Sequence, residues 1–102
     1  MGIVPLHKAP SRSEAESIIK ELTSRGAIRW SRHCNERMKE RDITMQQILN
    51  CLSKGKVVEE PFLSHKDGGG YETAIEKCTA GDWLRVVVCI KFNEKLLIVT
   101  VY

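Results

Sequence analysis

Two almost uninterrupted apolar runs near the end of the chain limit what it can fold into. Val86–Ile90 reads VVVCI and Leu96–Val99 reads LLIV, and only five residues separate them. Short apolar runs rich in branched side chains predict strands covered on at least one face, and the short link between them predicts a hairpin. Both runs are far shorter than the roughly 20 residues that a membrane-spanning helix needs. The chain is therefore expected to build a sheet here and to cover it with other elements.

The covering elements are expected in the first half, where apolar residues recur at helical spacing. Thr44 and Gln47 form a capping-box pattern, Ser11 or Ser13 is the N-cap candidate of the first helix, and Gly26 and Gly55 are natural helix stops. The helix in between begins after Ser31 and is amphipathic. Three helices are predicted, over residues 11–26, 31–41 and 44–54.

The order of the elements predicts the fold class. After Gly55 the pattern changes to strands, predicted at 57–58, 71–78, 83–92 and 95–102, with flexible turns at 67–70, 80–82 and 93–94. Helices followed by hairpin-linked strands are typical of an α+β domain with an antiparallel meander. We expect the first and third helices to pack on the sheet and to bury Ile48 and Leu97. Residues 1–10 are predicted to be a flexible arm, and 11–102 a single domain.

Positive charge is concentrated in the first part of the chain. Residues 1–58 hold 11 Lys and Arg against 6 Asp and Glu, whereas residues 59–102 hold 5 against 7, for a net charge of +3. A basic half suits an anionic partner. Solvated faces of ordinary helices give the same tally, so charge alone does not choose between these two interpretations.

The four cysteines predict free thiols. None forms a C-x-x-C pair, so zinc-ribbon and thioredoxin motifs are absent, and each thiol lies in an apolar or periodic stretch. Without a recognisable signal peptide, this pattern predicts a reduced, cytoplasmic protein. Adjacent helix residues point about 100° apart, so His33 and Cys34 are not expected to share a metal. We expect neither a metal nor another cofactor.

The segment from Trp30 to Ile43 carries the strongest functional signal. His33, Arg37 and Arg41 follow one another at four-residue steps, so on a helix they lie along one slanting stripe. An imidazole titrates near neutral pH, and guanidinium groups bind phosphate oxygens, which together suit RNA phosphate chemistry. The alternative is a charged helix face whose acidic residues pair with its arginines. On spacing alone, this alternative is favoured.

Aromatic side chains offer a second, weaker signal. Trp30, Trp83, Tyr71 and Tyr102 could stack on bases, and the hydroxyl of Tyr102 could reach a neighbouring surface or transfer a proton. Trp83 opens an apolar strand, which favours packing in the core or at its edge. Beside the stripe, Trp30, Ser31 and Arg32 are candidates for substrate binding.

The stripe belongs to a longer motif that resembles a known family. The motif comprises Ser31, His33, Arg37, Met38, Arg41 and Ile43, followed by Gly55–Val58 and the terminal Ile98–Tyr102. It is similar to domain-of-unknown-function family 4258, a bacterial family grouped with the barnase, EndoU, colicin and RelE-like (BECR) ribonuclease fold of toxin–antitoxin systems. The resemblance covers about residues 29–102. One departure is Cys34, where the family usually has alanine.

The resemblance implies both a fold and an activity. It implies helices packed on a curved antiparallel sheet of about four strands, with a site drawn from His33, Arg37 and Arg41. The leading hypothesis is a toxin-like, metal-independent endoribonuclease that acts on RNA by 2′-OH attack and has a possible cognate antitoxin as partner. In it, His33 transfers protons, Arg37 and Arg41 hold the phosphate, and Tyr102 is a candidate second proton-transfer group. The alternatives are a non-catalytic RNA- or protein-binding module, or an interaction domain in which the stripe only forms ion pairs.

Overall fold

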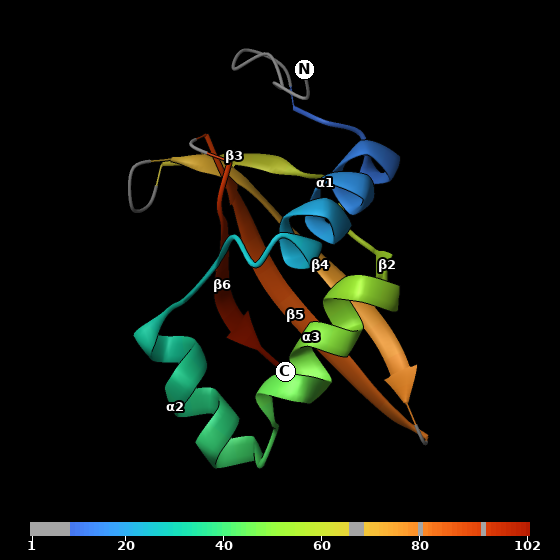
Figure 1. Cartoon of the computed structure of the whole chain (residues 1–102), viewed down its shortest axis with the longest axis vertical. Helices are drawn as coiled ribbons and strands as arrows, with labels where there is room; N and C mark the ends of the chain where they lie inside the picture. The colour runs from blue at the N-terminus through green and yellow to red at the C-terminus, as the bar shows by residue number, and fades with distance from the viewer. Residues whose placement is uncertain (1–8, 66–68, 80, 93) are drawn as a thin grey trace.

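Nine elements make up the described part of the chain. The computed structural model describes residues 9–65, 69–79, 81–92 and 94–102. The elements, labelled in Figure 1, are α1 (Arg12–Ser24), β1 (Ile28–Trp30), α2 (Arg32–Arg41), α3 (Met45–Lys54), β2 (Lys56–Val57), β3 (Phe62–Ser64), β4 (Gly70–Thr79), β5 (Asp82–Lys91) and β6 (Leu96–Val101). The protein is therefore of the α+β class, as predicted.

Each helix begins at a predicted capping residue, and of the two candidates for α1 it is Ser11 and not Ser13 that caps it. Ser11 and Glu14 form a capping box on α1, and Thr44 and Gln47 form another on α3. Ser31 caps α2 by accepting a hydrogen bond from the backbone N–H of Cys34 at 2.9 Å. These side chains satisfy N–H groups that have no partner within the helix. The three helix starts predicted from local sequence are confirmed.

The sheet is mixed and has six strands. The order along it is β1-β6-β5-β4-β2, and β3 also pairs with β4. The β4–β5 and β5–β6 pairs are antiparallel, as the predicted meander requires, but β1 runs parallel to β6, with Ile28 opposite Leu96. The expectation of about four antiparallel strands was therefore too low. It missed β1 and β3, which have three residues each and are recognisable mainly by their pairing with β6 and β4.

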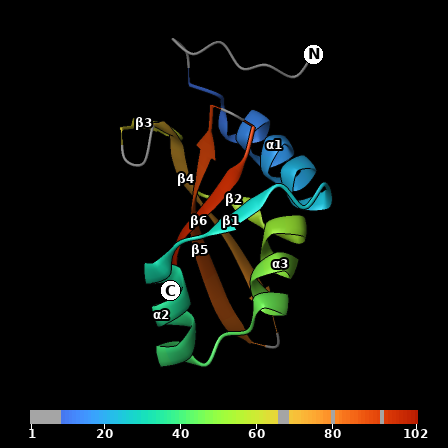
Figure 2. The same ribbon diagram turned by 60° about the vertical axis from the view of Figure 1, so that its left-hand side comes forward.

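One face of the sheet packs against the helices. In Figures 1 and 2, α1 and α3 follow one another along the sheet, and α2 lies beside the end of β6. The main apolar cluster joins side chains from the helices to alternate residues of the central strands. Its fully buried members include Ile19, Ile48, Leu52, Ile75, Val86, Val88, Leu96 and Ile98. Ile48 is buried as predicted.

Leu97 does not belong to this cluster. Leu96 and Ile98 belong to it, and Leu97 lies between them on a strand whose side chains alternate between faces. Leu97 is opposite Cys89 and is only half-buried. Its predicted burial was wrong because an unbroken apolar run does not reveal which of its residues face the helices.

The junction between α3 and β4 is tightly closed. The ammonium group of Lys20, on α1, donates to the backbone carbonyls of Ser53 and Gly55, at 3.0 Å each. A Cβ atom at Gly55 would lie 2.5 Å from the carbonyl oxygen of Cys51 and 2.6 Å from that of Glu76. The predicted stop at Gly55 is confirmed, and the approach of the β4 backbone explains why a residue without a side chain stands there.

Parts of some predictions fall outside the described residues. They are residues 1–8 of the predicted arm, residues 67 and 68 of the predicted turn at 67–70, Ala80 in the turn before β5, and Asn93 in the link to β6. Apart from these residues and residue 66, the predicted α+β domain is described.

Candidate functional site

The start of α2 is fastened to β6 by hydrogen bonds to the strand backbone. The hydroxyl of Ser31 donates to the carbonyl oxygen of Val99 at 2.6 Å, and its N–H donates to that of Ile98 at 3.1 Å. The β5–β6 register shifts at this point, since Val88 pairs with Ile98 and Val87 pairs with Thr100. Val99 is thus left out of the ladder, as in a bulge, and its carbonyl is available to Ser31.

Arg37 holds the middle of α2 against the end of β6. Its Nε donates to the carbonyl oxygen of Val101 at 3.4 Å, and its guanidinium carbon lies 5.3 Å from the centre of the Tyr102 ring. A guanidinium over an aromatic face is an attractive cation–π arrangement. Arg37 is only 27% exposed, whereas Tyr102 is 47% exposed. The two side chains therefore present a partly fixed charge next to an open phenol ring.

Ion pairs neutralise little of the α2 charge. Among the described residues, the one ion pair formed by this helix joins Arg37 to Glu40, at 3.9 Å. By contrast, Arg85 on β5 pairs with both Glu59 and Glu76, and its hydrogen bond to Glu76 raises its pKa. Of the ion pairs that the alternative interpretation expects between acidic residues and arginines of α2, the described residues thus form one, and its 3.9 Å distance is long.

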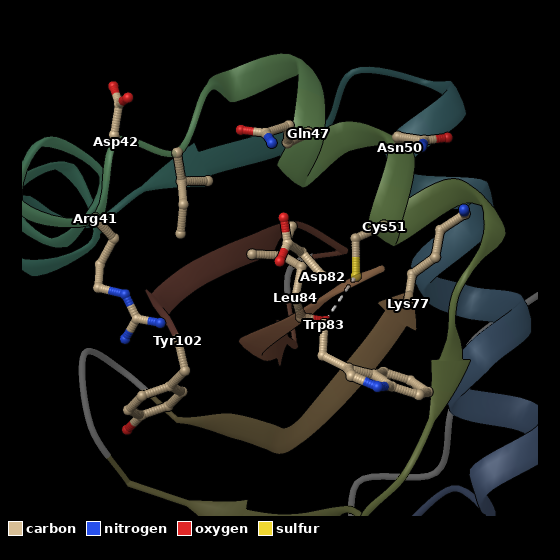
Figure 3. A pocket seen from close by; sticks show the side chains of 11 residues that line it. Arg41, Asp42, Gln47, Asn50, Cys51, Lys77, Asp82, Trp83, Leu84 and Tyr102 are labelled. Carbon is tan, nitrogen blue, oxygen red and sulfur yellow. Dashed lines mark hydrogen bonds between the residues drawn. The ribbon is translucent and has the colours of Figure 1, made fainter. Parts of the chain in front are cut away.

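A pocket lies next to the contact between Arg37 and Tyr102. It is formed by the end of α2, by α3 and by the beginning of β5 (Figure 3). Its volume is about 360 Å³, near the lower end of the roughly 300–1,000 Å³ typical of small-molecule sites. Figure 3 shows the guanidinium of Arg41 directed toward Tyr102 at one side of the pocket. The lining residues are Arg41, Asp42, Ile43, Gln47, Asn50, Cys51, Lys77, Asp82, Trp83, Leu84 and Tyr102.

The thiol in the pocket wall has a structural role. Cys51 is 1% exposed, and its sulfur donates to the carbonyl oxygens of Ile75 and Leu84 at 3.6 and 3.8 Å. Burial raises the pKa of this thiol to about 11. At neutral pH Cys51 is therefore a neutral, apolar part of the wall and not a thiolate nucleophile.

The structure brings three of the four predicted catalytic residues together. Arg37 contacts Tyr102, and Arg41 lines the pocket with Tyr102. His33 precedes Arg37 by one helical turn, is exposed, and is not among the residues that line the pocket. In the part of the chain that the structure describes, no hydrogen bond orients its imidazole.

The three predicted substrate-binding residues have different surroundings. Arg32 is exposed at the first position of α2, and Trp30 packs partly buried against the core. Ser31 uses its hydroxyl in the helix cap and in the bond to Val99. Their roles toward a substrate remain predictions, although the fold already occupies the hydroxyl of Ser31.

Most of the residues that line the pocket were not predicted from the sequence. Trp83 was expected in or near the core, but it is 69% exposed, because its position on β5 is opposite Cys78 on the sheet face away from the helices. Gln47 was identified only as a capping residue. Its spacing from Asn50 and Cys51, three and four residues, was the available sign that all three share a helix face. The participation of Asp82 depends on strand pairing and has no local signal.

Comparison with known proteins gives a family but no activity. Residues 30–102 match the model of a family described as Domain of unknown function (DUF4258). No curated protein matches the chain. The match begins at the end of β1 and covers α2, α3 and the following strands, which include the whole candidate site.

The described residues hold neither a membrane-spanning helix nor a cluster of metal ligands. No helix there is long and apolar enough to cross a membrane. No group of three or more His, Cys, Asp or Glu side chains is placed to hold a metal ion in the same part of the chain.

Proposed function

The chain belongs to the DUF4258 family, and from its site we propose that it binds single-stranded RNA across α2 and the end of β6 and cleaves it by attack of the ribose 2′-OH. The observation that supports this most is the contact of Arg37 with Tyr102, beside Arg41 and an open pocket. RNA recognition commonly combines guanidinium groups, which bind phosphate, with aromatic rings, which stack on bases. Here both kinds of group lie at one end of one strand.

The proposed reaction needs two proton transfers and stabilisation of charge. A base removes the 2′-OH proton, the 2′-oxygen attacks phosphorus, and the 5′-oxygen leaves as it receives a proton, giving a 2′,3′-cyclic phosphate. Arg37 and Arg41 would bind the non-bridging oxygens, where negative charge increases. His33 and Tyr102 are the proposed proton-transfer groups, with His33 as the more suitable at neutral pH.

A non-catalytic RNA-binding module is the second candidate, and the surroundings of His33 favour it. The imidazole is exposed and outside the pocket, and within the described residues nothing orients it. Efficient acid–base catalysis needs a group held within reach of the reacting proton. Binding through Arg37, Arg41 and Tyr102 needs no such group.

The experiment that separates the two candidates is cleavage of mixed RNA by the purified protein, with a chelator present and with end-group analysis. Cleavage is expected to leave 2′,3′-cyclic phosphate or 3′-phosphate ends. His33→Ala is expected to abolish turnover while the protein stays folded. Full activity of His33→Ala would refute the role of His33, and tight binding without cleavage by the unaltered protein would establish the binding module instead.

The binding surface is tested by Arg37→Ala and by a matched arginine elsewhere. Removing one phosphate contact is expected to weaken RNA binding uniformly across sequences and to lower the slope of log affinity against log salt by about 1. Arg29 is an exposed arginine on β1 and serves as the control, since it lies outside the site. Equal effects of Arg29→Ala and Arg37→Ala would show that binding reflects general positive charge.

We also propose that the chain is related to the ribonuclease toxins of the BECR fold. Helices packed on one face of a largely antiparallel sheet, with candidate residues at the end of the last strand, support it. If the chain acts as a toxin, its expression in a bacterial host arrests growth, and the His33→Ala form does not. A cognate antitoxin would then be the partner that restores growth.

A further inference from the structure

One wall of the pocket presents hydrogen-bond donors, and helix capping determines their orientation. The side-chain oxygen of Gln47 accepts hydrogen bonds from the backbone N–H of Thr44 at 2.7 Å and from its hydroxyl at 3.2 Å. With its oxygen engaged in this way, Gln47 has its NH₂ group left for another partner. Because Gln47 lines the pocket, these two N–H donors are available to a bound molecule.

The wall formed by β5 presents acceptors. Asp82 is the first residue of β5 and lines the pocket, and Figure 3 shows it reaching from the strand toward α3, which carries Gln47. In the described part of the chain, no ion pair or hydrogen bond engages its carboxylate. An ionised carboxylate only accepts hydrogen bonds, and its two oxygens can accept a pair of parallel N–H groups.

Part of the remaining lining is apolar or aromatic and suits a flat ring. Ile43, Leu84 and the neutral thiol of Cys51 provide apolar surface, and the rings of Tyr102 and Trp83 stand at the rim. Arg41 and Lys77 also line the pocket and attract anions, but a phosphodiester has no hydrogen-bond donor to offer the carboxylate of Asp82. Phosphate therefore belongs at Arg37 and Arg41, and the pocket suits the base attached to the neighbouring ribose.

We infer that this pocket selects a guanine base, an inference that rests on the proposed binding of RNA. On its Watson–Crick edge, guanine presents two adjacent donors, N1–H and N2–H₂, which match the two oxygens of Asp82. Its O6 is an acceptor beside those donors and matches the NH₂ group of Gln47. Uracil offers one ring N–H between two acceptors, and adenine and cytosine each pair an amino group with an acceptor ring nitrogen, so none of them satisfies a carboxylate with two donors.

The test is binding of short oligonucleotides that differ in one base. Hexamers of 2′-O-methyl uridine, which cannot be cut at the 2′-oxygen, carry a single central guanine, adenine, cytosine or uracil, and fluorescence anisotropy measures their affinities. The guanine hexamer is expected to bind about tenfold more tightly than the others, within the range that a bidentate base contact gives. Asp82→Asn is expected to reduce this preference to about twofold, because it replaces one acceptor with a donor.

Asp42→Asn is the matched control. It makes the same change of charge at another pocket residue, whose carboxylate Figure 3 shows directed away from Asp82 and Gln47. It is expected to keep the tenfold preference. Equal binding of all four hexamers, or an equal loss in Asp42→Asn and Asp82→Asn, would overturn the guanine assignment while leaving RNA binding intact. Binding of none of them would overturn the proposed function itself, and the assignment with it.

Discussion

The helices α2 and α3 each have ten residues, yet they are attached to the sheet in different ways. The helix α3 buries Ile48, Cys51 and Leu52, whereas α2 buries only Cys34. Besides Cys34 and the partly buried Met38, a set of polar contacts from Ser31 and Arg37 to β6 carbonyl groups holds α2. Apolar burial is strong but non-directional, and hydrogen bonds are weaker but determine orientation. The first attachment provides stability, and the second holds charged side chains at a defined place.

This difference explains where the candidate site lies. A helix held by a wide apolar face has few positions left for function, as with α3, which contributes Gln47 and Asn50 from its margin. A helix held through its cap, one arginine and a narrow apolar contact leaves most of its surface exposed. His33 and Arg41, which are both exposed on α2, are therefore available to a ligand.

The largest expected effect tests the buried side of the comparison. Ile98→Ala is expected to lower the free energy of unfolding by about 2–5 kcal/mol, because it leaves a cavity in the core. Leu97→Ala, the neighbouring position on the opposite face, is expected to cost less than half as much, since Leu97 is already partly in contact with water. Chemical denaturation measures both, and equal losses would show that the two sheet faces are not distinguished as described.

A smaller effect tests the polar attachment. Ser31→Ala removes the cap of α2 and its bond to Val99, and is expected to cost about 1–2 kcal/mol of unfolding free energy. Ser13→Ala, at an exposed position of α1, is the control and is expected to change stability by less than about 0.5 kcal/mol. If Ser31→Ala leaves stability unchanged, something other than this hydroxyl holds α2.

The smallest expected effect is a difference in how often α2 and α3 open locally, which thiol labelling measures without changing the stability of the protein. Cys34 on α2 and Cys51 on α3 are both buried free thiols. Because α2 has fewer apolar contacts, Cys34 is expected to react with a thiol reagent several times faster than Cys51 under native conditions. Mass spectrometry of the labelled protein follows each site, and exposed Cys78 is the fast reference. Faster labelling of Cys51 would reverse the comparison.

Features that depend on adjacent residues could be predicted from the sequence, whereas features that depend on distant segments could not. The caps at Ser11, Ser31 and Thr44 depend on adjacent residues, and so they were visible in the sequence. Arg37 and Tyr102 were both predicted as site residues, but the sequence did not show that the guanidinium of Arg37 lies over the ring of Tyr102. The geometry of this contact depends on the bulge at Val99, and the exposure of Trp83 depends on strand register. Neither has a signature in local sequence, because both are set by pairing between distant segments.

The bond between Ser31 and Val99 also affects how the protein folds. It joins residues 68 positions apart, and the parallel pairing of β1 with β6 spans a similar stretch of chain. Contacts of such long range form slowly, because the entropy of closing the loop is lost before the contact is gained. We therefore expect α2 to dock on β6 after α3 has covered β4 and β5. The candidate site forms only with this docking, so ligand binding would report a late step of folding.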